Sequence, residues 1–133
     1  MESVYIKKIV ENCLSFPERV AVVDNDGARE TTYGAILELA RKTAAFISGR
    51  GIEAQSFITV KLPSCAEYMA VEIGIWLSRC VAVPMGDKFP QERIDYILEH
   101  CNSALMIDKD VLPEINSQSA AELSAIRYPD NTT

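Results

Sequence analysis

Residues 64–99, SCAEYMAVEIGIWLSRCVAVPMGDKFPQERIDYILE, decide what this chain can fold into. Ser64 followed by Glu67 is a capping-box pattern, because the hydroxyl can accept from the Glu67 N–H while the carboxylate reaches back, so a helix is predicted to start here. Along residues 66–77 the main polar interruptions are Glu67 and Glu72. We therefore expect a central helix that is buried on more than one side and carries more apolar surface than one sheet face can hide.

A short strand and a second helix follow within the same stretch. Val81–Val83 is an apolar run of strand length, and Pro84 is expected to end it because proline has no N–H for the ladder. Gly86 marks a turn, and Pro90 suits the first turn of the next helix. One face of that helix is apolar, with Ile94, Ile97, Leu98 and Cys101 at helical spacing.

The N-terminal part of the chain predicts a helix, a hairpin and a second helix. Apolar residues at helical spacing indicate a helix over residues 3–14. The turn Asn25-Asp26-Gly27 tolerates positive φ, so residues 19–24 and 28–32 are predicted to pair as a β-hairpin. A one-sided helix is expected from Tyr33, with Gly51 just past its end.

Strands and helices then alternate along the rest of the chain. Strands are expected at residues 57–62, 81–83 and 104–107, with a helix between each pair, and residues 111–115 suit one helical turn. Such alternation predicts parallel strands joined by right-handed crossovers. The predicted fold class is therefore α/β: a mainly parallel sheet with helices on both faces plus a small N-terminal β-hairpin.

Several short motifs occur in a shared order. The chain has Thr32-Tyr33, Glu38-Leu39, Val83-Pro84, Phe89-Pro90 and Glu92-Arg93. Across roughly residues 15–110 this order resembles the N-terminal end of an adenylate-forming enzyme, a member of the AMP-binding superfamily of amino-acid adenylation domains, acyl-CoA synthetases and luciferases. The residues Arg79-Cys80 and Met85-Gly86 depart from the usual amino-acid adenylation pattern, so the resemblance is to the superfamily and not to one subfamily.

The resemblance implies a role within a larger protein. Residues 1–110 would be the N-terminal α/β subdomain of an adenylation domain, and residues 111–133 a weakly structured segment leading to the missing phosphate-loop region. The intact parent would use ATP and magnesium to make an acyl adenylate, and then a thioester on phosphopantetheine or CoA. The family's phosphate loop, substrate pocket and catalytic lysine lie downstream, so the implied role here is scaffold, with no catalytic, cofactor-binding or metal-binding residue in this chain.

Partners and compartment follow from the same resemblance and from composition. The implied partners are the remainder of the parent domain and an acyl or peptidyl carrier protein, and the apolar central helix predicts self-association of the fragment. A formal net charge of -6 argues against nucleic acid and anionic membranes, which reward clustered Lys and Arg. No signal peptide or apolar run of transmembrane length is visible, so a cytoplasmic protein is expected.

A second class of function remains open from the residues alone. The chain could be a stand-alone α/β ligand-binding or protein-interaction domain that uses a sheet edge. Gly86-Asp87-Lys88 follows a strand end, where ligands bind in open parallel sheets, although a solvated turn is the preferred interpretation. Coding sequence that continues past Thr133 into a glycine-rich phosphate loop would favour the enzyme.

Individual side chains give few candidates for chemistry. Cys65 would lie in the first turn of the central helix, where the helix dipole lowers a thiol pKa. His100, the single histidine, would lie in a last helical turn, and a surface or capping role is favoured over catalysis. Trp76 and Tyr68 are expected in the core. Turn carboxylates are interpreted as structural and not as metal ligands: Asp24, Asp26 and Asp87.

The four cysteines are predicted to be free thiols, because a cytoplasmic α/β domain has a core of its own and needs no disulfide. Cys13, Cys65, Cys80 and Cys101 show no CxxC pair and no metal-ligand spacing. Thiol titration of the denatured protein without reductant should therefore find four thiols. A count of two or none would contradict the prediction.

Overall fold

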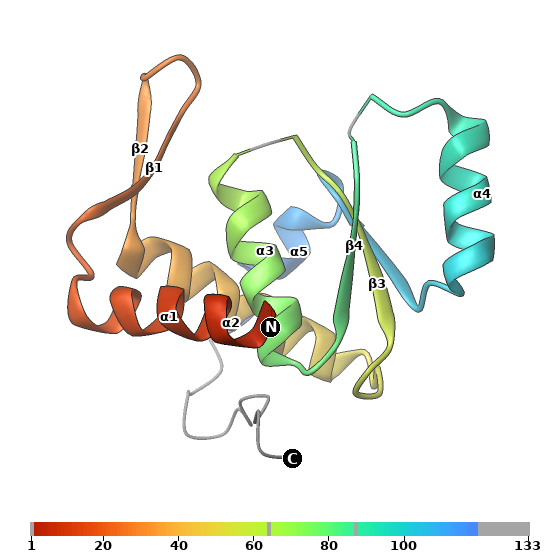
Figure 1. Cartoon of the computed structure of the whole chain (residues 1–133), viewed down its shortest axis with the longest axis horizontal. Helices are drawn as coiled ribbons and strands as arrows, with labels where there is room; N and C mark the ends of the chain where they lie inside the picture. Colours follow the sequence, from red (N-terminus) through yellow and green to blue (C-terminus); the bar gives the residue numbers. More distant parts are fainter. Residues whose placement is uncertain (1, 64, 87, 120–133) are drawn as a thin grey trace.

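Three parallel strands form the centre of the structure (Figure 1). The computed structural model describes residues 2–63, 65–86 and 88–119. Strands β3 (Phe57–Lys61), β4 (Val81–Met85) and β5 (Leu105–Asp108) lie in the order β4-β3-β5, with both neighbouring pairs parallel. The predicted parallel sheet is confirmed, with strand boundaries that differ by one or two residues.

Helices cover the two faces of this sheet unequally. On one face lie α2 (Tyr33–Gly49), α3 (Ala66–Leu77) and α5 (Leu112–Asn116), while α4 (Gln91–Cys101) lies on the other (Figure 1). Strands β4 and β5 flank β3 on opposite sides, so right-handed crossovers place α3 and α4 on opposite faces. The cover from α4 is thin, since Ile94 is buried but Ile97, Leu98 and Cys101 are only half-buried.

The N-terminal part forms a separate layer. Helix α1 (Glu2–Ser15) leads to an antiparallel hairpin of β1 (Val20–Asp24) and β2 (Arg29–Thr32), which is not joined to the three-stranded sheet. Its turn has φ values of 55° at Asn25, 55° at Asp26 and 86° at Gly27, as the turn chemistry predicts. The hairpin projects from the body of the molecule (Figure 1).

Helix α3 is the centre of the core. One side packs with α1 and α2, through residues that include Ala70, Ile73 and Leu77, and the other side packs through Val71 and Ile75 on the sheet. The prediction of a helix buried on more than one side is confirmed. Helix α2 covers the apolar surface of α3 that the sheet leaves open. The large exposed apolar side chains lie elsewhere: Leu14, Phe16, Val20, Val23, Phe57, Val81 and Tyr96.

The start of α3 differs by one residue from the start that the capping-box pattern predicts. The helix starts at Ala66 with Cys65 as its N-cap, and Cys65 makes no side-chain capping bond. Ser64 lies outside the described residues, and the Glu67 carboxylate is bound to Arg29 instead. The Glu67 carboxylate thus pairs with a charge that is distant in the sequence.

Pro84 lies inside β4 and does not end it. The strand runs on to Met85, and Pro84 is in register with Val60. Val81 donates its N–H to the Ser56 carbonyl at 2.9 Å, so by the alternation of a parallel strand the Pro84 nitrogen points to the open side of the sheet. Because β4 is an edge strand, the missing N–H removes no ladder hydrogen bond.

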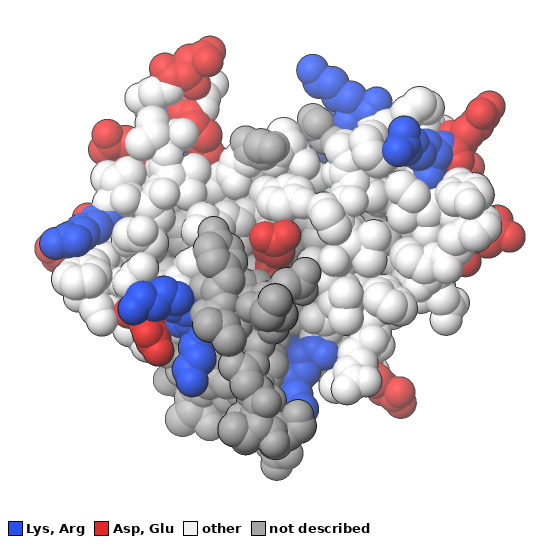
Figure 2. Space-filling view, in the orientation of Figure 1, with Lys and Arg blue, Asp and Glu red and all other residues white. Residues whose placement is uncertain are grey.

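All four cysteines are free in the structure, with Cys13 and Cys80 buried and Cys65 and Cys101 half-buried. Within the described residues, no helix has both the length and the apolar character needed to cross a membrane. Charged side chains of both signs are interspersed on the face shown in Figure 2, and acidic ones gather at the hairpin tip.

Gly74 on α3 allows the close approach of α2, and Gly74→Ala should destabilise the protein by about 1–3 kcal/mol. A Cβ at this position would lie 2.5 Å from Thr43 Cβ and 2.6 Å from the Ala40 carbonyl oxygen. Thr43 is fully buried and has no room to move aside. Urea unfolding measures the loss.

Gly49→Ala is the matched control, because nothing lies within 4 Å of an added Cβ there. It should stabilise the protein by about 0.4–1 kcal/mol through the unfolded state. Equal unfolding midpoints for the two variants would contradict the packing argument.

Candidate functional site

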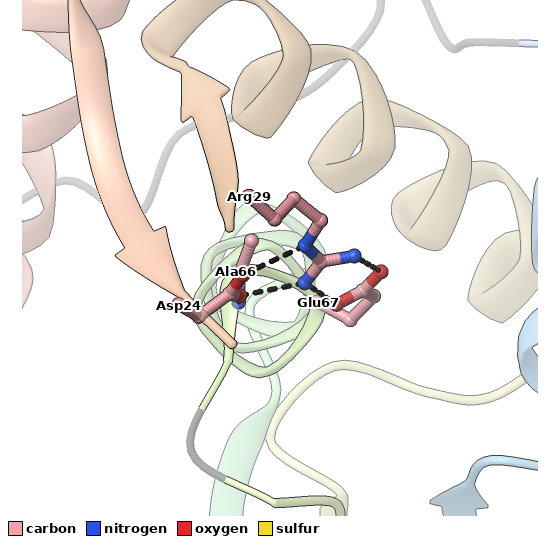
Figure 3. A network of polar contacts seen from close by, with 4 residues as sticks. All are labelled: Asp24, Arg29, Ala66 and Glu67. Carbon is pink, nitrogen blue, oxygen red and sulfur yellow. Dashed lines mark hydrogen bonds and ion pairs between the residues drawn. The ribbon is translucent and has the colours of Figure 1, made fainter. Parts of the chain in front are cut away.

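The densest polar cluster in the described residues surrounds Arg29 on β2 (Figure 3). Arg29 donates from Nε and Nη2 to the two Asp24 oxygens at 2.7 and 2.6 Å, and from Nη1 and Nη2 to the two Glu67 oxygens at 2.8 and 2.7 Å. The planar guanidinium thus binds two carboxylates at once, each in a bidentate geometry. We call this group of Asp24, Arg29 and Glu67 the Arg29 clamp.

The clamp also supplies the cap of α3. Asp24 Oδ2 accepts the backbone N–H of Ala66 at 3.0 Å, from 42 residues upstream in the sequence. A carboxylate at this position satisfies one of the unpaired N–H groups of the first helical turn and interacts favourably with the helix dipole. Asp24 therefore connects the hairpin to the central helix as well as to Arg29.

The electrostatics keep all three groups charged at neutral pH. Hydrogen bonds from Arg29, and then from the Ala66 N–H, lower the pKa of Asp24 to about 2. Hydrogen bonds from Arg29 likewise lower the pKa of Glu67 to about 2. The two carboxylates raise the pKa of Arg29 in turn. Asp24 is the most shielded member, with 12% of its side chain exposed, against 28% for Glu67 and 44% for Arg29.

Beside the clamp lies a cleft of about 230 Å³ between β2, α2, the start of α3 and the end of α5. Its charged lining is mixed, with Arg29 and Lys42 set against Glu38 and Glu67. Lys42 Nζ donates to the Asn116 carbonyl at 3.2 Å. No His, Cys or Ser is among the described residues that line the cleft, so the arrangement suits packing or polar binding better than nucleophilic chemistry.

The alternative of a reactive Cys65 thiol is not supported by the structure. This residue is the N-cap of α3, and burial raises the pKa of its thiol instead of lowering it. His100 has the predicted surface position in the last turn of α4. Its Nδ1 lies 2.9 Å from the Tyr96 carbonyl oxygen, and its ring stacks on Tyr96 at 3.8 Å.

The aromatic candidates on α3 belong to the core, as predicted. Trp76 is 8% exposed and belongs to the core cluster that α3 forms with α1 and α2. Tyr68 is half-buried against the cluster between α3 and the sheet. Of the turn carboxylates, Asp26 is exposed and Asp87 lies outside the described residues. Asp24 is not only a turn residue, because its carboxylate accepts hydrogen bonds from Arg29 and from the Ala66 N–H at the start of α3.

Sequence reasoning missed the clamp, although part of its signal was present. Asp24 and Arg29 flank the predicted turn and are cross-strand partners in the hairpin, where opposite charges stabilise the pair. Glu67 was assigned to a local cap, and nothing local indicates that it meets a residue 38 positions away. No group of three or more His, Cys, Asp or Glu close enough to hold a metal ion occurs in the part of the chain that the structure describes.

The comparisons with known proteins give the family. The model for "AMP-binding enzyme" matches residues 9–131. The chain belongs to the AMP-binding enzyme family. This is the family that the motifs around Val83-Pro84 and Phe89-Pro90 indicated.

The curated relatives of this chain are much longer than the matched region. A linear gramicidin synthase of Brevibacillus parabrevis is 32% identical over 91 residues, covering 68% of this chain and 2% of that protein. A dimodular nonribosomal peptide synthase of Bacillus subtilis (strain 168) is 29% identical over 91 residues, covering 68% of this chain and 4% of that protein. The solved Mycobacterium tuberculosis fatty acyl CoA synthetase superposes with a TM-score of 0.79 at 18% identity, covering 95% of this chain and 30% of that one, which shows the shared fold.

Acid should weaken the folded state through the clamp. The pKa values of Asp24 and Glu67 are lowered in the folded protein, so their stabilisation is present above the ordinary carboxyl pKa and is lost as pH falls toward 2. Asp24→Asn and Glu67→Gln should each flatten the loss of stability between about pH 5 and pH 2. Urea midpoints measured across this range test the expectation.

Glu114→Gln is the control, because the Glu114 carboxylate forms an exposed ion pair of 3.3 Å with Arg50, and such surface pairs contribute little to stability. Its stability profile should follow that of the wild type. If the clamp variants also follow the wild-type acid profile, the clamp does not carry the acid dependence.

Proposed function

We propose that this chain is a scaffold portion of an ATP-dependent carboxylate-activating enzyme. The parent would form an acyl adenylate and pyrophosphate and then transfer the acyl group to the thiol of phosphopantetheine or CoA. The observation that carries this proposal is the family match over residues 9–131, which contains a complete parallel βαβαβ unit from β3 to β5. In this proposal residues 1–110 form the scaffold subdomain, and residues 111–133 lead toward the phosphate loop of the parent.

ATP and magnesium belong to the intact parent in this proposal, and we assign no site for them here. Charge on a transferring phosphate is stabilised by cationic groups, metal ions and convergent N–H donors. Five of the described cationic side chains are engaged in other contacts. Arg29 binds two carboxylates, Lys42 binds a backbone carbonyl, and Arg19, Arg50 and Arg93 lie over phenylalanine rings.

The contacts that hold α3 in place support the proposed scaffold role. The sheet is anchored from one face by α3, whose position is set by α2 on the far side and by the Arg29 clamp at its N-terminus. Such an anchored unit can hold neighbouring parts of a larger domain in a defined geometry, which catalysis by positioning requires. The proposed partners are the remainder of the parent adenylation domain and, for a peptide synthetase parent, an acyl or peptidyl carrier protein.

Residues 1–133 alone should neither bind ATP tightly nor form an adenylate. Carboxylate-dependent exchange of labelled pyrophosphate into ATP measures the reaction, with a panel of amino acids and fatty acids as substrates. The comparison is between this chain and a longer protein that extends it through a phosphate loop and a catalytic lysine. Activity confined to the longer protein supports the scaffold role, whereas exchange above background by the 133-residue chain would refute it.

A further inference from the structure

We propose that the β1–β2 hairpin is a strap, hinged at its base and latched at its tip by the Arg29 clamp, that opens as one unit while the three-stranded sheet stays folded. Opening would remove the Asp24 cap from α3 and take the Arg29 and Thr31 wall off the cleft. This inference does not depend on the proposed enzymatic role. The hairpin is bound to the body at its base and through the Arg29 clamp, and its strands form a sheet separate from the three-stranded one.

The hairpin has little apolar anchoring of its own. It is a two-stranded sheet without pairing to β3, β4 or β5, and such hairpins are marginally stable by themselves in water. Val20 and Val23 are 43% and 56% exposed, and the contribution to the core comes from the half-buried Ala21 and Val22. Something other than apolar burial must therefore hold much of the hairpin against the body.

The base of the hairpin has the features of a hinge. Its two ends are joined by backbone hydrogen bonds from Tyr33 N–H to the Arg19 carbonyl and from Gly34 N–H to the Pro17 carbonyl, both 2.9 Å. The strand register shifts between Val20 and Val22, an irregularity of the kind that bends a strand locally. These bonds keep the base in place when the far end moves.

The tip is attached in another way, through the Arg29 clamp. Asp24 and Arg29 are the residues that flank the turn, and they reach α3 through Glu67 and the Ala66 N–H (Figure 3). Arg29 is the one cation in residues 20–32, which also contain Asp24, Asp26 and Glu30. Without the guanidinium, Asp24 would face Glu67 with no counter-charge, so repulsion would favour the open strap.

Hydrogen exchange followed by mass spectrometry on the full chain tests the strap. Arg29→Gln should make amides in residues 20–32 and at the start of α3 exchange about tenfold faster, because local opening no longer breaks the clamp. Amides of β3 should exchange at the wild-type rate. Arg29→Lys keeps the charge but not the double fork, so its hairpin rates should lie between those of the wild type and Arg29→Gln.

Two further variants make the outcome decisive. Glu114→Gln removes a surface ion pair that joins α5 to Arg50 and does not involve the hairpin, so it should leave hairpin exchange unchanged. Glu67→Gln removes only the α3 side of the clamp and leaves the Asp24 pair and cap, so it tests the strap even if Arg29→Gln does not fold. Faster hairpin exchange with unchanged β3 exchange supports the strap. Unchanged hairpin exchange, or equal acceleration in the hairpin and β3, would overturn it.

Discussion

The burial of α3 on two sides is the constraint on which the rest of the structure depends. A helix with this little polar surface cannot rest on a sheet with its back to water, so α2 must cover the side that the sheet leaves open. The close approach is possible because Gly74 has no side chain where α2 passes, beside Thr43 and the Ala40 carbonyl. The order of the layers, with α1 and α2 outside α3 and the sheet beneath it, follows from this one requirement.

The N-terminus of α3 shows how a tertiary contact can replace a local one. Ser64 and Glu67 have the spacing of a capping box, yet Glu67 binds Arg29 and the Ala66 N–H is held by Asp24. A bidentate guanidinium–carboxylate pair is a stronger use of Glu67 than one bond to a backbone N–H. The consequence is that the hairpin and the central helix are coupled, since one carboxylate serves both.

The motifs that indicate the AMP-binding family and the Arg29 clamp are separate features of this chain. The matched relatives are far longer than the chain. Some motifs that indicated the family lie in β4 at Val83-Pro84 and at the start of α4, and others, at Thr32-Tyr33 and Glu38-Leu39, lie near the clamp. The two features address different questions. The motifs identify the family, and the clamp shows how this chain holds its own N-terminal layer in place.

The sequence by itself determined the parallel sheet, the order of its elements, the hairpin turn and the two-sided burial of α3, because periodicity, turn chemistry and apolar runs are local properties of the chain. The turn at residues 25–27 also carried a signal for the Asp24–Arg29 cross-strand pair, which the sequence analysis did not use. Only the tertiary structure decided that Glu67 completes the clamp, that Pro84 lies within an edge strand, and that α2 covers the apolar surface of α3. Each of these depends on which distant segment arrives beside a residue. The local pattern permits several partners, and the packing of the whole chain selects one of them.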